Sequence, residues 1–259
     1  MTSDAVLLDR SAGVGTITIN RPEQRNALNG EVRQAIVDAV YECANDDAVR
    51  VAVVRGSGGV AFASGADLRE LSQYDPAGAR DHFAEFNGQL EQLEAAPIPI
   101  IAMISGYALG GACELAAACD LRVATDSSRF GMPIGRIGHS IDKGNMRRLL
   151  RLMPPAELKA MLLTDDLISA AHALRIGLVN WVVPAQSLEA FTYDLARRVG
   201  SKAPLAVRAA KRLINEVCDE RTAPTEGDAD LASSLFATED FAEGAAAFLE
   251  KRTPNFVGR

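Results

Sequence analysis

The feature that most constrains this chain is a stretch without any charge, which runs from Ala95 to Cys113. Its Gly106 and Gly110 have the spacing found where membrane helices pair. However, Pro97 and Pro99 interrupt its first third, and isoleucines crowd the residues that follow. We therefore predict a buried strand over residues 98–104, followed by a tight glycine turn, and we expect no membrane span.

Strands and helices alternate on both sides of this buried strand. Val14–Ile19 and Val51–Val54 have the apolar character of strands, and between them Asn29 is a suitable N-cap for a helix. The same reasoning predicts a helix containing Phe83, Phe86, Leu90 and Leu93, a helix around Glu114 and a short strand at Leu121–Ala124. This order predicts an α/β fold built from right-handed crossover units.

The second half of the chain is mostly helical in its pattern. From Gly144 onward only Leu178–Val183 resembles a strand, and from about Pro204 the pattern is that of helices alone. We therefore divide the chain into an α/β core over residues 1–200 and a C-terminal helical region over residues 201–259. Such a helical region buries its apolar faces on its own core or on a neighbouring subunit.

Charge and cysteine content exclude several classes of protein. The 27 basic and 34 acidic residues give a net charge of −7, and no run of Lys or Arg exceeds two, so we expect no nucleic-acid partner. The first residues lack the basic and apolar regions of a signal peptide, so we expect a cytoplasmic protein. Four cysteines without metal-ligand spacing predict packed thiols and no metal site: Cys43, Cys113, Cys119 and Cys218.

The predicted turn after the buried strand carries the first candidate for chemistry. Gly110 and Gly111 let a ligand approach the backbone, and the first amides of the following helix have no partner within that helix. Glu114 lies among apolar residues of the same helix, where a raised pKa would suit proton transfer. A second glycine loop, residues 62–68, also ends at a helix start, so amides from two elements can meet at one oxygen.

Five motifs in the same order resemble those of the crotonase (enoyl-CoA hydratase/isomerase) family. They are Asn20-Arg-Pro22 with Arg25-Asn-Ala-Leu28, then Phe62 to Leu68, then Gly106 to Ala116, then Phe130-Gly-Met-Pro133, and finally Phe248 to Pro254. Together they span nearly the whole chain. The resemblance implies a crotonase-like ββα spiral core with a C-terminal helical trimerisation region, in a homotrimer or a dimer of trimers.

The resemblance also implies a role for particular residues. The amides of Ala66 and Gly111 would bind the oxygen of an acyl-coenzyme A thioester, and Glu114 would be the acid or base. The substrate would lie along Arg25, Ala27, Leu28, Asp67, Leu68, Gly110 and Ile134, with Lys251 near a phosphate of coenzyme A. No cofactor would be needed, because coenzyme A is part of the substrate. Hydration of a 2-enoyl-CoA in fatty acid metabolism would be the leading activity.

One departure from the family pattern leaves the reaction open. Two-carboxylate hydratases carry Phe-Gly-x-Pro-Glu, but here Ile134 replaces the second glutamate. Asp142 or His139 would be its replacement, although a loop aspartate and a surface histidine are the simpler interpretations. Isomerisation of an enoyl-CoA by Glu114 alone, and a paralogue that binds acyl-CoA without catalysis, therefore stay open.

Two unrelated enzyme classes fit the sequence less well. Gly56-Ser-Gly-Gly-Val-Ala61 follows a strand as in NAD-binding folds, but no helix begins within it. An NAD-dependent oxidoreductase is thus a remote alternative. A serine hydrolase would need a nucleophile elbow, which neither Ser64 nor Ser105 occupies. His82 and His172 are interpreted as surface or half-buried side chains.

Overall fold

The two sheets of the protein explain where its buried strands lie. The computed structural model describes residues 4–138, 140–218, 234 and 237–259. Within them, one sheet has six strands in the order β1-β2-β3-β5-β7-β10, and a smaller sheet has four in the order β4-β6-β8-β9. The strands are β1 (Val6–Ser11), β2 (Val14–Ile19), β3 (Val51–Gly56), β4 (Ala61–Ala63), β5 (Ile100–Ile104), β6 (Tyr107–Leu109), β7 (Leu121–Thr125), β8 (Arg129–Gly131), β9 (Ile168–Ser169) and β10 (Trp181–Val183).

Most neighbouring strands are parallel, as a chain of alternating strands and helices requires. The β2–β3, β3–β5 and β5–β7 pairs of the larger sheet are parallel, whereas β1 pairs with β2 as an antiparallel hairpin. In the smaller sheet, β4, β6 and β8 are parallel and β9 is antiparallel. The predicted α/β class and the predicted strands of the first half are confirmed. The sequence did not reveal the short strands β4, β6, β8 and β9, nor β1.

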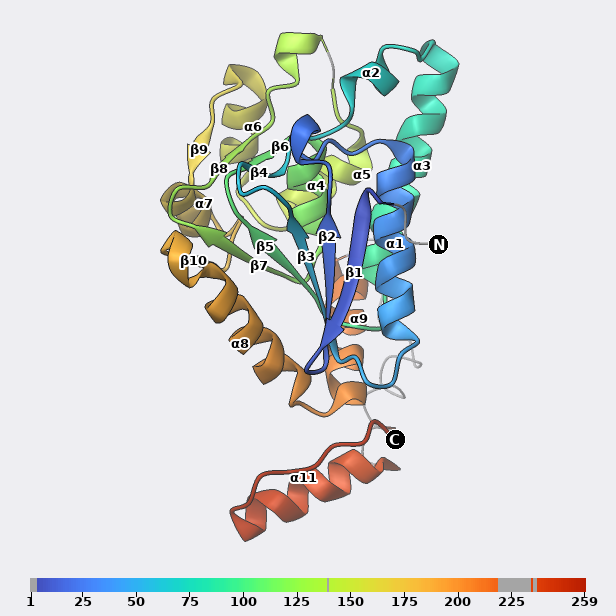
Figure 1. Cartoon of the computed structure of the whole chain (residues 1–259), viewed down its shortest axis with the longest axis vertical. Coiled ribbons are helices and arrows are strands. Elements are labelled where there is room, and N and C mark those ends of the chain that lie inside the picture. Colours follow the sequence, from blue (N-terminus) through green and yellow to red (C-terminus); the bar gives the residue numbers. More distant parts are fainter. Residues whose placement is uncertain (1–3, 139, 219–233, 235–236) are drawn as a thin grey trace.

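Helices cover both faces of the larger sheet (Figure 1). The helices are α1 (Gly30–Ala44), α2 (Leu68–Leu71), α3 (Pro76–Ala95), α4 (Gly111–Ala118), α5 (Lys143–Leu150), α6 (Pro155–Thr164), α7 (Ala170–Ile176), α8 (Leu188–Gly200), α9 (Pro204–Cys218) and α11 (Glu239–Glu250). Along β3, Ala52 and Val54 join the core beneath α1, whereas Val51 and Val53 join a second core beneath α8. This alternation places β3 in the middle of the molecule.

The C-terminal helices differ in how they meet the rest of the chain. Figure 1 shows α9 against the lower part of the molecule and α11 at the far end, away from both sheets. The last residues return to the start of α9, where Gly258 lies beside Pro204. No helix among the described residues combines the length and the apolar character needed to cross a membrane. The boundary at residue 200 remains a prediction.

Candidate active site

Glu114 lies on α4, a short helix that directly follows β6. The helix begins after Gly110, whose φ of 53° and ψ of −124° are accessible to glycine but strained for other residues. Every residue of α4 from Ala112 to Ala118 is buried, and Glu114 is 3% exposed. The fold therefore holds a carboxyl group inside an apolar helix, as the sequence predicts.

Two glycine loops meet beside the start of α4. A Cβ atom on Gly65, which has a φ of 95°, would lie 2.7 Å from the carbonyl oxygen of Leu109. A Cβ atom on Gly111 would lie 3.6 Å from the amide nitrogen of Ala66. The second separation is an ordinary contact, but the first is too short for a real Cβ atom, so residue 65 must be glycine for the two loops to approach this closely. The loops thus place the amides of Ala66 and Gly111 next to each other.

The pairing around Ala66 leaves its amide directed away from Leu28. Leu28 forms a parallel bridge with Ala66, in which the Leu28 amide donates to the Gly65 carbonyl and the Asp67 amide donates to the Leu28 carbonyl. Gly111 is the first residue of α4, where amides have no partner in their own helix. Two such amides can hold the oxygen of a polarised carbonyl.

These groups border one cavity of about 290 Å³. Its walls include Gly65, Ala66, Leu68, His82, Phe83, Phe86, Gly110, Gly111, Glu114, Ile134 and Ile137. Of the predicted site residues, the cavity therefore brings together Glu114, Ala66, Gly111, Gly110, Leu68 and Ile134. Apart from Glu114 the wall is mainly apolar, which suits a ligand that is hydrocarbon at its reacting end.

Burial gives Glu114 an unusual affinity for protons. Desolvation raises the pKa of Glu114 to about 8, and the negative charge of Asp142 acts in the same direction. The positive charge of Arg148 acts against both. A carboxyl group with a pKa near neutrality can both accept and donate a proton during one reaction.

Asp142 is the N-cap of α5 and is not exposed to solvent like a simple loop residue. Its Oδ1 accepts from the Gly144 amide at 2.6 Å and from the Asn145 amide at 3.1 Å. Burial works to raise the pKa of Asp142, but hydrogen bonds from Asn87, Asn145 and Gly144 outweigh it, so the pKa lies below its usual value. Asp142 is therefore held as a carboxylate, and its negative charge disfavours ionisation of Glu114.

Four other predicted binding residues are not among those that line the cavity. Ala27 and Leu28 are buried in the chain that pairs with Ala66, whereas Arg25 is exposed after a 3₁₀ turn. Asp67 caps α2 through the Arg69 amide and accepts a hydrogen bond from Arg21 at 3.1 Å. Arg21 is thus already committed to a partner, and Arg25 is the freer cation of the pair.

The remaining predictions fall farther from this cavity or outside the described residues. Lys251 is exposed at the end of α11, which Figure 1 shows at the opposite end of the molecule from α2. His139 lies outside the described residues. Cys43, Cys113 and Cys119 are buried as predicted, but Cys218 is exposed, because it ends α9 at the surface.

The interpretation of His82 as a surface or half-buried residue is wrong. His82 is 5% exposed and lies on the face of α3 that also buries Phe86, Gln89 and Leu93. Their spacing of three or four residues was a signal that the sequence carried. His172, in contrast, is half-buried and lies 2.8 Å from Glu157.

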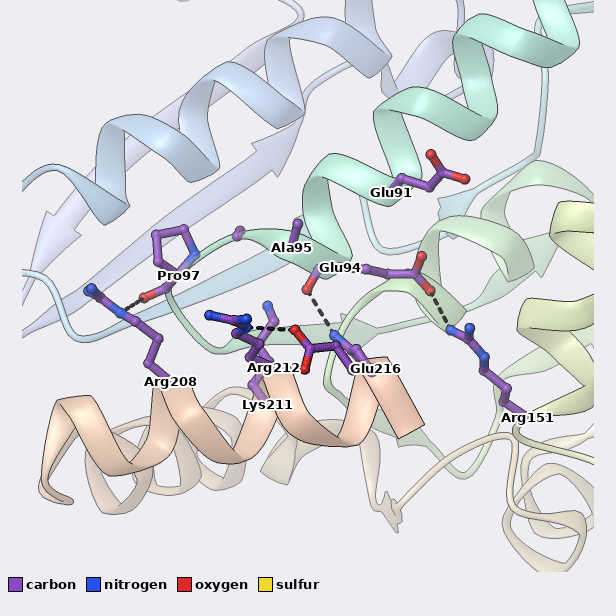
Figure 2. Close-up of a pocket in the computed structure, with 11 residues that line it drawn as sticks. Glu91, Glu94, Ala95, Pro97, Arg151, Arg208, Lys211, Arg212 and Glu216 are labelled. Atoms are coloured by element: carbon purple, nitrogen blue, oxygen red, sulfur yellow. Dashed lines mark hydrogen bonds and ion pairs between the residues drawn. The ribbon is translucent and has the colours of Figure 1, made fainter. Parts of the chain in front are cut away.

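A larger hollow lies at the other end of α3. Figure 2 shows it between the end of α3 and α9, and its volume is about 470 Å³. Several of its charged groups form ion pairs: Arg151 with Glu94 and Arg212 with Glu216 within the lining, and Lys211 with Asp120, which does not line it. The cavity of Glu114 is the stronger candidate site, because it holds a buried carboxyl group with a raised pKa beside converging amides.

Comparisons with known proteins agree on one family. A model described as enoyl-CoA hydratase/isomerase matches residues 9–259. The chain is 38% identical to a crotonyl-CoA hydratase of Syntrophomonas wolfei, over 100% of both chains. It is 36% identical to a 2,3-dehydroadipyl-CoA hydratase of Escherichia coli, over 98% of this chain and 99% of that one.

The fold comparison agrees as well. A crystal structure of an enoyl-CoA hydratase/carnithine racemase from Magnetospirillum magneticum matches with a TM-score of 0.94 and 33% identity, covering 99% of this chain and 97% of that one. The predicted fold class is therefore confirmed.

Proposed function

The chain belongs to the enoyl-CoA hydratase/isomerase family, and on that premise we propose that it hydrates the C2–C3 double bond of a 2-enoyl-CoA. The observation that carries this proposal is the position of Glu114. It is a buried carboxyl group with a pKa raised to about 8, and it borders the same cavity as the converging amides of Ala66 and Gly111. Relatives named crotonyl-CoA hydratase and 2,3-dehydroadipyl-CoA hydratase support the same reaction class.

In this mechanism the two amides stabilise the enolate. The thioester oxygen accepts hydrogen bonds from the Ala66 and Gly111 amides, and each such donor contributes about 2.7–4 kcal/mol in other enzymes. The Glu114 carboxylate takes a proton from water as its oxygen bonds to C3. The resulting enolate then takes this proton at C2, so one carboxyl group completes the addition of H and OH.

Ile134 favours a second candidate, isomerisation of a 3-enoyl-CoA to a 2-enoyl-CoA. Ile134 lines the cavity together with Glu114 and supplies no second carboxyl group. Isomerisation needs only one, because Glu114 removes a proton from C2 and returns it to C4 of the same enolate. Both reactions use the same amides and differ in whether water enters.

We further propose how the rest of the substrate and the assembly are arranged. Coenzyme A lies along residues 25–28 and 66–68, with Arg25 near its phosphates, and no separate cofactor takes part. Lys251, at the end of α11, lies far from the cavity of its own subunit. It therefore binds a phosphate of coenzyme A only in the cavity of a neighbouring subunit. The assembly is a homotrimer or a dimer of trimers, and this location of α11 supports such an assembly.

Turnover of crotonyl-CoA and of a 3-enoyl-CoA by the wild type and by Glu114→Gln tests the proposal. We expect the wild type to hydrate crotonyl-CoA and Glu114→Gln to lose about 10²–10⁴ of that rate. Glu91→Gln, which changes an exposed glutamate on α3, is the matched control and should retain full activity. Isomerisation without hydration would replace the first candidate with the second.

Binding can be measured separately from turnover. Acyl-CoA thioesters should raise the melting temperature of both the wild type and Glu114→Gln, because ligand binding stabilises the folded state, whereas the free acids should not. Tight binding without turnover would support the non-catalytic paralogue. The absence of any shift would refute the proposal as a whole.

A further inference from the structure

Arg33 places a cation inside the protein close to the cavity of Glu114. Its side chain, on α1, is 3% exposed. The guanidinium donates to Gln89 Oε1 at 3.0 Å, to the Leu28 carbonyl at 3.2 Å and to Glu70 Oε2 at 3.4 Å, and it lies 3.5 Å from His82 Nδ1. One side chain thereby connects α1, α2 and α3.

The contact with Leu28 leads to the first of the two amides. The Leu28 carbonyl accepts from Arg33 and also from the Asp67 amide, at 3.3 Å. The Leu28 amide donates to the Gly65 carbonyl at 2.8 Å. Leu28 is thus hydrogen-bonded on both sides of Ala66, and Arg33 fixes the carbonyl end of that pairing.

The contact with Phe86 leads to the second amide. The guanidinium carbon of Arg33 lies 5.2 Å from the centre of the Phe86 ring, a cation–π arrangement. A Cβ atom on Gly111 would lie 3.3 Å from Phe86 Cε1, so the ring packs directly against the residue that provides the amide. Arg33 therefore contacts one residue next to each amide: Leu28, which pairs with Ala66, and Phe86, which packs against Gly111.

The stability of the fold does not by itself explain a buried arginine at this position. Replacing a buried ion pair by apolar side chains of similar size is often neutral or stabilising, because desolvation of the charges is costly. The acidic neighbours of Arg33 also reach solvent: the Glu70 side chain is 27% exposed, and Glu85, at 3.9 Å, is 54% exposed. What distinguishes the position of Arg33 is that it lies between the supports of Ala66 and Gly111.

We propose that Arg33 is a positioning residue that holds the Ala66 and Gly111 amides in the geometry needed to polarise a thioester carbonyl. Arg33 does not line the cavity and acts through Leu28 and Phe86. The inference rests on the proposed function, because it assigns a task to Arg33 only if a thioester oxygen binds between the two amides.

Three variants test the proposal. Arg33→Lys keeps the charge but lacks the planar fork that reaches several partners at once. Glu70→Gln weakens the Arg33 network at a partly exposed position and should fold normally even if Arg33 variants do not. Arg10→Gln is the control. It removes an exposed arginine that pairs with Glu42 and does not line the cavity.

The decisive measurement is the absorption spectrum of a bound 2,4-dienoyl-CoA at saturation, well below the melting temperature. Hydrogen bonds to the thioester oxygen polarise the conjugated system and shift its absorption to longer wavelength, so the shift reports the amides and not global stability. We expect Arg33→Lys to lose most of this shift and about 10–100-fold in kcat, with a smaller change in KM. Glu70→Gln should show a smaller loss of both, and Arg10→Gln none.

The possible failures are distinguishable. If the wild type neither binds nor shifts the dienoyl-CoA, the proposed function fails and the inference fails with it. If the wild type shifts the spectrum and folded Arg33→Lys and Glu70→Gln retain the full shift and kcat, only the role of Arg33 is overturned.

Discussion

At the scale of the residue, the central feature is the burial of Glu114, which determines its proton affinity. Desolvation and the nearby charge of Asp142 favour its protonated form, while Arg148 limits the effect. Arg148 itself is held by a two-pronged ion pair with Glu94, at 3.0 and 2.9 Å. The proton affinity of one carboxyl group is therefore set by residues on α3, α4 and α5 together.

The raised pKa of Glu114 predicts how stability depends on pH. The pKa rises from 4.5 to about 8 on folding, so the folded state holds a proton that the unfolded state releases. This contribution to stability is complete below pH 4.5 and is lost as pH rises towards 8. Glu114→Gln removes the loss, so its free energy of unfolding relative to the wild type should increase by a few kcal/mol between pH 5 and 8, at about 1.4 kcal/mol per pKa unit.

Denaturant unfolding of both proteins across this pH range provides the measurement. Glu91→Gln, the exposed control, should follow the wild type. A constant difference between Glu114→Gln and the wild type at all pH values would show that Glu114 is not a proton-holding buried group.

The charge of Asp142 should raise the pKa of Glu114 but should not be needed to cap α5. Asn is as good an N-cap as Asp, so Asp142→Asn removes the charge and keeps an acceptor for the Gly144 amide. Because Glu114 must be ionised to take the proton from water, its pKa sets the acidic limb of the kcat/KM profile. The charge of Asp142 raises that pKa, so the variant should move the acidic limb to lower pH. An unchanged profile with lost activity would instead indicate that Asp142 acts on the substrate.

The sequence predicted some of these residues and not others, for a physical reason. Glu114 was predictable because its own helix is apolar, so the burial of its carboxyl group follows from local sequence. The burial of His82 and Arg33 depends on the packing of α1 against α3. These two helices are separated in the chain by two strands and a short helix. Asp142 was recognised, but its role as a cap required the start of α5 to be known.

At the scale of the element, the glycine loops before α2 and α4 determine where the amides lie. Both loops follow short parallel strands of the smaller sheet, β4 and β6, so the ends of these strands meet at one edge. The sequence predicted the two glycine motifs and their convergence, because each lies at a helix start. It did not reveal β4 and β6, because strands of three residues are too short for a periodic pattern.

Gly65→Ala tests this arrangement. The substitution combines a strained φ of 95° with a contact of 2.7 Å to the Leu109 carbonyl, so the two loops must separate. We expect about 1–3 kcal/mol of destabilisation and a loss of about 10²–10³ in kcat as one amide is displaced. Gly59→Ala is the matched control, with a φ of 70° but no atom within 4 Å of its Cβ; it should lose stability but retain kcat.

At the scale of the whole molecule, the C-terminal helices expose large apolar side chains. Ile214 and Val217 on α9 are 62% and 78% exposed, and Phe248 and Leu249 on α11 are 83% and 80% exposed. Since contiguous exposed apolar surface is uncommon on a monomer, these faces suit contacts with further copies of the chain. The sequence predicted a helical region of this kind from the loss of strand patterns after Pro204.

We predict an oligomer of at least three subunits by light scattering at micromolar concentration. Replacing Phe248 and Leu249 together by Asp should yield smaller species, because charges are costly to bury in an interface. Leu163→Asp on α6, where Leu163 is 82% exposed, is the control and should leave the mass unchanged. A monomeric wild type would contradict this prediction.

The most direct test of the account is exchange of the C2 hydrogens of a saturated acyl-CoA with deuterium oxide, followed by mass spectrometry. Butyryl-CoA has no double bond, so exchange reports only removal and return of a proton beside a polarised thioester. We expect exchange by the wild type, a loss of about 10²–10⁴ in rate for Glu114→Gln, and full exchange by Glu91→Gln. Binding of butyryl-CoA without exchange, or equal exchange by Glu114→Gln, would contradict it.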